Sequence, residues 1–135
     1  MRPGFRPSPY NQDMGTFHVE LRVENIARRA NGATLRKVMV DTGAEFSWVP
    51  EAVLESIGVK REKKDLPFAM ANGAVITRAT GFALLRVGDA FTVDEVVFAE
   101  KGDLSLLGAR TLEGLNLMVD PARKRLVAAG PTPAA

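Results

Sequence analysis

The sequence predicts a mostly β protein of barrel or sandwich kind, made of about seven short strands and two short helices. Apolar and polar residues alternate over segments of strand length, and turn signals such as Asn-Gly and Gly-Asp separate them. Helical periodicity is confined to two brief segments. With 135 residues, of which 46% are hydrophobic and 25% charged, the chain has the size and composition of one globular domain.

The first part of the chain predicts two strands and a helix. Apolar and polar residues alternate from 16 to 23, which indicates a half-buried strand. A tight turn at Asn31-Gly32 leads to a second strand over 35–40, whose last residues are all apolar and therefore expected to be buried on both faces. Pro50 then begins a short helix over 51–57.

The rest of the chain predicts a hairpin followed by shorter elements. Apolar segments flank Asn72-Gly73, so a hairpin is expected over 66–80. The further elements predicted are strands over 82–87, 91–98 and 105–107, a helix over 111–113 that ends at Gly114, and strands over 115–119 and 125–128. Pro-containing ends predict a flexible N-terminal arm (1–15) and C-terminal tail (130–135) around one domain (16–129).

The composition excludes several kinds of chemistry. The chain has no cysteine and one histidine, His18. Thiol nucleophiles, disulfides and Cys-ligated zinc are therefore excluded, and we expect no metal and no cofactor. Because His18 lies within the first alternating segment, it is interpreted as an exposed strand residue rather than a member of a Ser-His-Asp triad.

The charge pattern gives no sign of a nucleic-acid or membrane partner. Eighteen basic and sixteen acidic residues leave a formal charge of +2. The basic clusters at 28–29, 60–64 and 123–125 contain no interleaved aromatic residues, so they are interpreted as solvated loop ends. No apolar stretch approaches the ~18 residues of a membrane span, and the N-terminus lacks the apolar core of a signal peptide, which predicts a cytoplasmic protein.

One tripeptide stands out as a candidate for chemistry. Asp41-Thr42-Gly43 directly follows the apolar segment 38–40, which places a carboxylate where a buried strand ends in a turn. A glycine there leaves room for a ligand or a second backbone segment. The simpler interpretation is an Asp that caps its own turn through an Asx hydrogen bond.

A second marker, Leu106-Leu107-Gly108, lies downstream and leads into the second predicted helix. Together with Asp41-Thr42-Gly43-Ala44, the following segment 47–50, its helix and the intervening hairpin, it resembles the retropepsin-like aspartic proteases over about residues 17–128. This family comprises the retroviral proteases and their cellular and prokaryotic relatives. The similarity is greatest to the small prokaryotic aspartyl protease-like proteins, which have close counterparts of residues 41–44 and 106–115.

The resemblance implies a single-domain, closed β-barrel-like protomer with a flap hairpin, acting as a homodimer on peptide or protein substrates. Asp41 of each chain would form the catalytic pair. The chemistry supports a dimer independently, because it needs two carboxylates that share one proton, whereas the chain has one Asp-Thr-Gly. A twofold dimer supplies the second. The C-terminal strand, 126–128, is expected to interleave with its mate.

The resemblance also assigns roles to individual residues. Thr42 would form hydrogen bonds across the twofold axis, and the Gly43 carbonyl would bind the substrate backbone. The expected substrate-binding residues are Met39, Ala44, Trp48, Leu104 and Leu106 in the pocket walls and Met70, Ala71, Asn72 and Gly73 in the flap. Core packing is the alternative for Met39, Leu104 and Leu106. Trp48 is the better pocket candidate, because a large aromatic residue just before a helix-opening proline is poorly placed for a deep core.

The sequence also departs from the retroviral pattern. Retroviral members carry an acid after Asp-Thr-Gly-Ala and an arginine after the apolar-apolar-Gly motif, and these two residues pair; here the positions hold Glu45 and Ala109. Arg110 is the nearest substitute, although a shift of one helical residue turns a side chain by about 100°. The flap is also poorer in glycine. Two other functions therefore stay open: a non-catalytic dimeric module that binds peptides or a partner protein in the same groove, and a structural β domain of a larger assembly.

Overall fold

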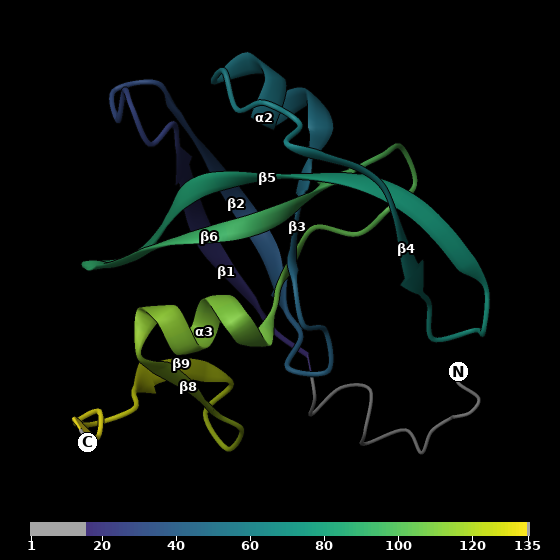
Figure 1. Ribbon diagram of the computed structural model, residues 1–135. Coiled ribbons are helices and arrows are strands. Elements are labelled where there is room, and N and C mark those ends of the chain that lie inside the picture. The colour runs from purple at the N-terminus through teal and green to yellow at the C-terminus, as the bar shows by residue number, and fades with distance from the viewer. Residues whose placement is uncertain (1–15, 135) are drawn as a thin grey trace.

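The computed structural model describes residues 16–134. The expected N-terminal arm, 1–15, lies outside the described residues. Two short helices and nine strands make up the described part (Figure 1). In chain order they are β1 (His18–Glu24), β2 (Gly32–Val40), β3 (Ser47–Pro50), α2 (Glu51–Ser56), β4 (Lys63–Ala69), β5 (Val75–Val87), β6 (Ala90–Ala99), β7 (Leu106–Leu107), α3 (Ala109–Leu115), β8 (Leu117–Asp120) and β9 (Arg125–Ala128).

The strand pairings close six of these strands into a ring. β1 pairs with β2, β2 with β7, β7 with β3, β3 with β6, β6 with β5, and β5 returns to β1. β4 pairs with the first half of β5 and extends the sheet beyond the ring. The prediction of a mostly β, barrel-like fold with two short helices is confirmed. Most of the strand pairings are antiparallel, but β2–β7 and β3–β6 are parallel.

Several predicted boundaries differ from the structure for identifiable reasons. β3 was not predicted, because a short strand with buried neighbouring residues shows no alternation. β5 is one strand rather than two, since it continues through Gly81, where a Cβ would collide with the Lys60 carbonyl oxygen. α3 likewise runs through Gly114 and ends at Leu115, and the next residue, Asn116, adopts a left-handed φ of 55°. In both cases the prediction ended an element at a glycine. Gly81 and Gly114 instead lie within a strand and a helix, where the absence of a side chain leaves room for a neighbouring segment.

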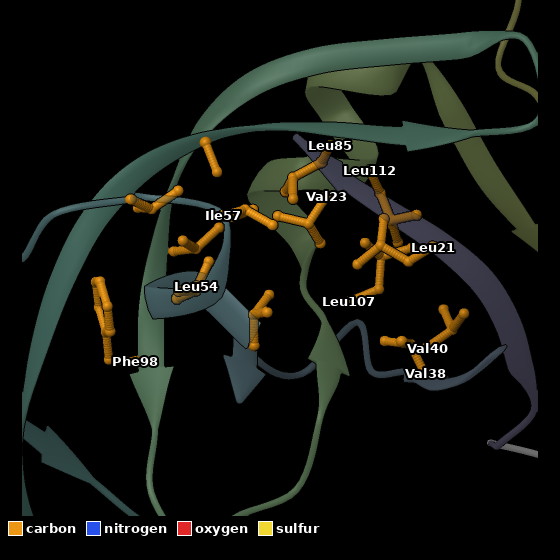
Figure 2. Close-up of a cluster of buried hydrophobic side chains, with 14 residues drawn as sticks. Leu21, Val23, Val38, Val40, Leu54, Ile57, Leu85, Phe98, Leu107 and Leu112 are labelled. Atoms are coloured by element: carbon orange, nitrogen blue, oxygen red, sulfur yellow. The ribbon is translucent and has the colours of Figure 1, made fainter. Parts of the chain in front are cut away.

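The core lies inside the ring. Alternate residues of β1, β2, β5 and β6 point inward, among them Leu21, Val38, Leu85 and Phe98, and all are almost fully buried (Figure 2). Leu54 of α2 also packs into this cluster. Because β2 is buried through Val38 and Val40, the residue that follows it is held at a fixed place.

The C-terminal residues form a separate two-stranded sheet next to α3 (Figure 1). β8 and β9 pair antiparallel, and Leu126 packs against the barrel core. The strand that was expected to interleave with a second chain is thus paired within its own chain along one edge. Residues 129–134 belong to no helix or strand. Within residues 16–134, neither helix has the length and apolar character needed to cross a membrane.

Candidate active site

The loop that follows β2, residues 41–46, carries the Asp-Thr-Gly motif and is called the Asp41 loop here. The backbone N–H of Asp41 donates to the Leu107 carbonyl at 3.0 Å, and the Ala44 N–H donates to the Asp41 carbonyl at 3.2 Å. The first bond ties the loop to β7, which pairs with β2 in parallel. Two segments far apart in the sequence therefore fix the backbone position of Asp41.

Asp41 is half-buried, and within residues 16–134 its carboxyl group accepts a hydrogen bond through one oxygen. Oδ1 accepts the Gly43 N–H at 3.0 Å, which is the Asx hydrogen bond of the simpler interpretation. Oδ2 accepts no hydrogen bond from the described residues. A Cβ on Gly43 would lie 3.3 Å from Oδ1 and crowd the carboxylate. The turn thus orients Asp41 while leaving one oxygen available.

The start of α3 holds the Asp41 loop from the other side. Ala109 and Arg110 donate their backbone N–H groups to the carbonyls of Ala44 and Glu45, at 2.8 and 3.1 Å. A Cβ on Gly108 would collide with the Phe46 carbonyl oxygen. The two sequence markers, Asp-Thr-Gly and Leu-Leu-Gly, are therefore in direct contact, and Gly108 permits that contact by having no side chain.

A groove of about 720 Å³ lies between the Asp41 loop and the hairpin formed by β4 and residues 75–80 of β5, called the groove hairpin here. Its lining comes from both of these elements, from β3 and from residues before and within β7. The lining residues are Asp41, Gly43, Ala44, Glu45, Phe46, Trp48, Pro67, Phe68, Ala69, Met70, Ala71, Gly102, Asp103, Leu104 and Leu106. The groove has the size of a ligand site.

The structure brings most of the expected site residues to this groove. Those that line it are Asp41, Gly43, Ala44, Trp48, Met70, Ala71, Leu104 and Leu106. Four others, Met39, Thr42, Asn72 and Gly73, do not line it in this single chain. Thr42 is exposed beside the carboxylate. Leu104 is 63% exposed, so the core-packing alternative is wrong for this residue.

One wall of the groove is aromatic. The Phe68 ring stands edge-on to Phe46 and Trp48, with centroids 5.6 and 5.3 Å apart. The reason given for placing Trp48 in a pocket was wrong, because this residue is only 6% exposed and packs on Val97. β3 is a central strand, so Trp48 is both buried and part of the groove wall. Sequence reasoning missed Phe46 and Phe68, since nothing local marks a phenylalanine as facing a groove.

The tip of the groove hairpin is a tight turn over residues 70–74. The Met70 and Ala74 backbones are joined by a 2.8 Å hydrogen bond, and the Asn72 side chain accepts the Ala74 N–H at 2.9 Å. Gly73 has a φ of +87°, a conformation typical of the glycine in an Asn-Gly turn. The conformation of this tip thus depends on a residue without a Cβ.

Three charged residues near the groove differ in their partners. Asp103 accepts two hydrogen bonds from Arg78, at 2.7 and 2.9 Å, and these bonds hold the pKa of the Asp103 carboxyl below its ordinary value. Glu45 makes no ion pair within residues 16–134. Arg110 places its guanidinium 4.6 Å from the centre of the Phe46 ring, so the expected Glu45–Arg110 pair does not form within this chain.

Replacing Arg78 by Gln should destabilise the fold in a pH-dependent way. At pH 7 we expect a loss of about 1–3 kcal/mol in the free energy of unfolding, because the largely buried Asp103 carboxylate loses its partner. Since Asp103 has a lowered pKa in the folded state, the contribution of the pair is complete above the unfolded pKa of about 4 and is lost as pH falls through the folded value. Urea unfolding at pH 7 and at pH 3 measures both; an equal loss at the two pH values would contradict this account.

The chain is similar to one known protein family. Residues 26–114, about two thirds of the chain, match the family described as gag-polyprotein putative aspartyl protease. The chain belongs to this family. Its predicted retropepsin-like character is thereby confirmed. No curated protein shows significant sequence similarity to the chain.

Within this aspartyl protease family match lie the Asp41 loop, the groove hairpin and most of α3. The match therefore includes the Asp-Thr-Gly and Leu-Leu-Gly motifs that contact each other in the structure. Asp41 is the only aspartate of the sequence in an Asp-Thr-Gly motif. Each chain therefore carries one copy of this motif.

Proposed function

We propose that this protein is an aspartic endopeptidase that hydrolyses peptide bonds of an extended substrate in the groove, with a dyad formed by Asp41 of two chains. One observation carries the proposal: the Asp41 carboxyl group lines a groove of about 720 Å³, and one of its oxygens has no partner among the described residues. The family match supports the same chemistry. Thr42 and Gly43 complete the proposed catalytic turn.

The proposed reaction requires two carboxylates that share one proton. The ionised carboxylate takes a proton from water as its oxygen attacks the peptide carbonyl carbon, and the protonated one gives its proton to the carbonyl oxygen. Collapse of the tetrahedral intermediate breaks the C–N bond, and proton transfer to nitrogen releases the amine. A second copy of the chain, related by a twofold axis, would supply the second Asp41.

The groove offers two ways of holding an extended peptide. The wall formed by Phe46, Trp48 and Phe68 buries apolar substrate side chains. β4 pairs only with β5 among the described strands, so its other edge has backbone groups for an added strand. The Gly43 carbonyl and the hairpin residues 70–73 would then bind the substrate backbone from opposite sides.

Incubation of the purified protein with a mixed peptide library, between about pH 4 and pH 7, tests the proposal. Over this range a shared-proton dyad carries a single charge. We expect internal cleavage of peptides with large apolar residues next to the scissile bond, without added metal or cofactor. Peptides that are bound but never cut would instead favour a non-catalytic dimeric binding module. Glu45 makes no ion pair within residues 16–134, and this favours the alternative, because the retroviral acid–arginine pair does not form among the described residues.

Changing Gly73 to Val tests the groove hairpin as a flap. A β-branched residue at a φ of +87° costs roughly 1–2 kcal/mol, although no atom lies within 4 Å of its Cβ position. We therefore expect a distorted tip and a fall in kcat/KM, with little change in the melting temperature of the barrel. Gly73→Asn is the matched control, since asparagine tolerates this conformation. If Gly73→Val retained the kcat/KM of the parent, the hairpin would not act as a flap.

A further inference from the structure

A chain of hydrogen bonds runs beneath the Asp41 loop, through residues that the proposed reaction does not use. Ser47 Oγ accepts the Gly108 N–H at 3.0 Å and lies 2.5 Å from Thr111 Oγ1. Thr111 Oγ1 donates to Asp94 Oδ2 at 2.8 Å. Ser47 and Thr111 are fully buried, so no solvent competes for these hydroxyl groups.

The direction of every bond in this chain follows from the groups at its ends. A threonine hydroxyl has one hydrogen, and that of Thr111 is given to the Asp94 carboxylate. Ser47 must therefore donate its own hydrogen to Thr111, which leaves its oxygen to accept from the Gly108 N–H. Each hydroxyl both donates and accepts.

Asp94 anchors the chain as an acid rather than as an amide. Its Oδ2 accepts from Thr111, and its Oδ1 accepts the Glu95 N–H at 2.8 Å. An asparagine has one acceptor oxygen and would turn an NH₂ group toward one of the two donors. Only a carboxylate satisfies both.

The other end of the chain reaches the candidate catalytic residue through one peptide group. The Gly108 N–H that Ser47 binds and the Leu107 carbonyl belong to the same planar peptide unit. That carbonyl accepts the Asp41 N–H at 3.0 Å. Any rotation of this unit therefore displaces the acceptor of the Asp41 backbone.

We propose that Asp94, Thr111 and Ser47 are positioning residues, which fix the Leu107–Gly108 peptide unit and through it the placement of the Asp41 carboxylate. This inference rests on the proposed function for its consequence in catalysis. A displacement of about 1 Å in a catalytic group costs up to roughly a hundredfold in rate. The aromatic wall of the groove takes no part in this chain of hydrogen bonds, so we expect the affinity for substrate to change little.

The decisive variant is Thr111→Val, which keeps the side-chain shape and removes the hydroxyl. We expect kcat to fall roughly tenfold or more, with KM within about twofold of the parent. Thr111→Ser, which restores a hydroxyl, should return kcat to within about threefold of the parent. Asp94→Asn should behave like Thr111→Val, and the double variant Ser47→Ala/Thr111→Val should be no worse than the more impaired of its two single variants.

Two further measurements separate positioning from general destabilisation and from failure of the proposed function. Leu54→Ala, a core variant on α2, provides a control that lowers stability without removing any of these hydrogen bonds. Amide NMR needs no activity: Thr111→Val should shift the Asp41 and Gly108 N–H resonances and speed their hydrogen exchange, and Leu54→Ala should not shift them selectively. Unchanged Asp41 and Gly108 amides in Thr111→Val would overturn the inference, even if the wild-type protein cleaved no peptide. Equal losses of kcat in Thr111→Val and Leu54→Ala would also overturn it.

Discussion

Replacing Asp41 by Asn should lower kcat by at least about a thousandfold and leave the fold intact. Asparagine has the same shape and can still accept the Gly43 N–H through its Oδ1, so the turn keeps its hydrogen bond. Its neutral amide cannot take a proton from the attacking water, and the loss of a general base accounts for about 10²–10⁴ in rate. Steady-state cleavage of a peptide selected from the library measures the effect, with circular dichroism and urea unfolding as checks on the fold.

The matched control is Asp89→Asn, the same chemical change at an exposed turn between β5 and β6. This variant should retain the parental kcat and KM. Cleavage by purified Asp41→Asn at more than a few per cent of the parental rate would remove Asp41 from the catalytic role. The Asx interpretation, in which Asp41 only caps its turn, predicts that outcome.

Mixing the wild-type chain with inactive Asp41→Asn should suppress activity, because the proposed site takes one carboxylate from each of two chains. After exchange of subunits, a ninefold excess of the variant leaves only about one tenth of the wild-type chains paired with each other, as random pairing requires. Activity per wild-type chain should fall to the same fraction. An enzyme complete within one chain would show no loss.

Dilution tests the same dimer without any mutation. Below the dissociation constant, activity per chain should fall in proportion to protein concentration. Adding an excess of inactive Asp41→Asn should then lower activity, whereas adding the active Asp89→Asn variant should raise it. A species that sediments as a monomer and is fully active at the assay concentration would rule out the shared dyad. Deleting residues 125–135 is a poorer test, because β9 pairs with β8 and Leu126 packs in the core of the same chain.

The sequence alone determined the features whose cause is local. Alternation predicted β1, and the Asn72-Gly73 signal predicted the hairpin over 66–80. The Asp-Thr-Gly motif located the Asp41 turn. Each of these depends on neighbouring residues, so the information is contained in a few consecutive positions.

Only the tertiary structure decided which distant residues meet at the groove. Trp48 is both buried and part of the groove wall because β3 is a central strand. Phe68 contacts it from β4, which pairs with β5 rather than with β3. Gly81 and Gly108 are required because backbone from another segment passes where a Cβ would be. The Asp94–Thr111–Ser47 chain likewise joins β6, α3 and β3. Such contacts arise because the ring is closed by strands that are not consecutive in the sequence. A local sequence pattern cannot predict them, because the same serine or glycine is equally common in a turn.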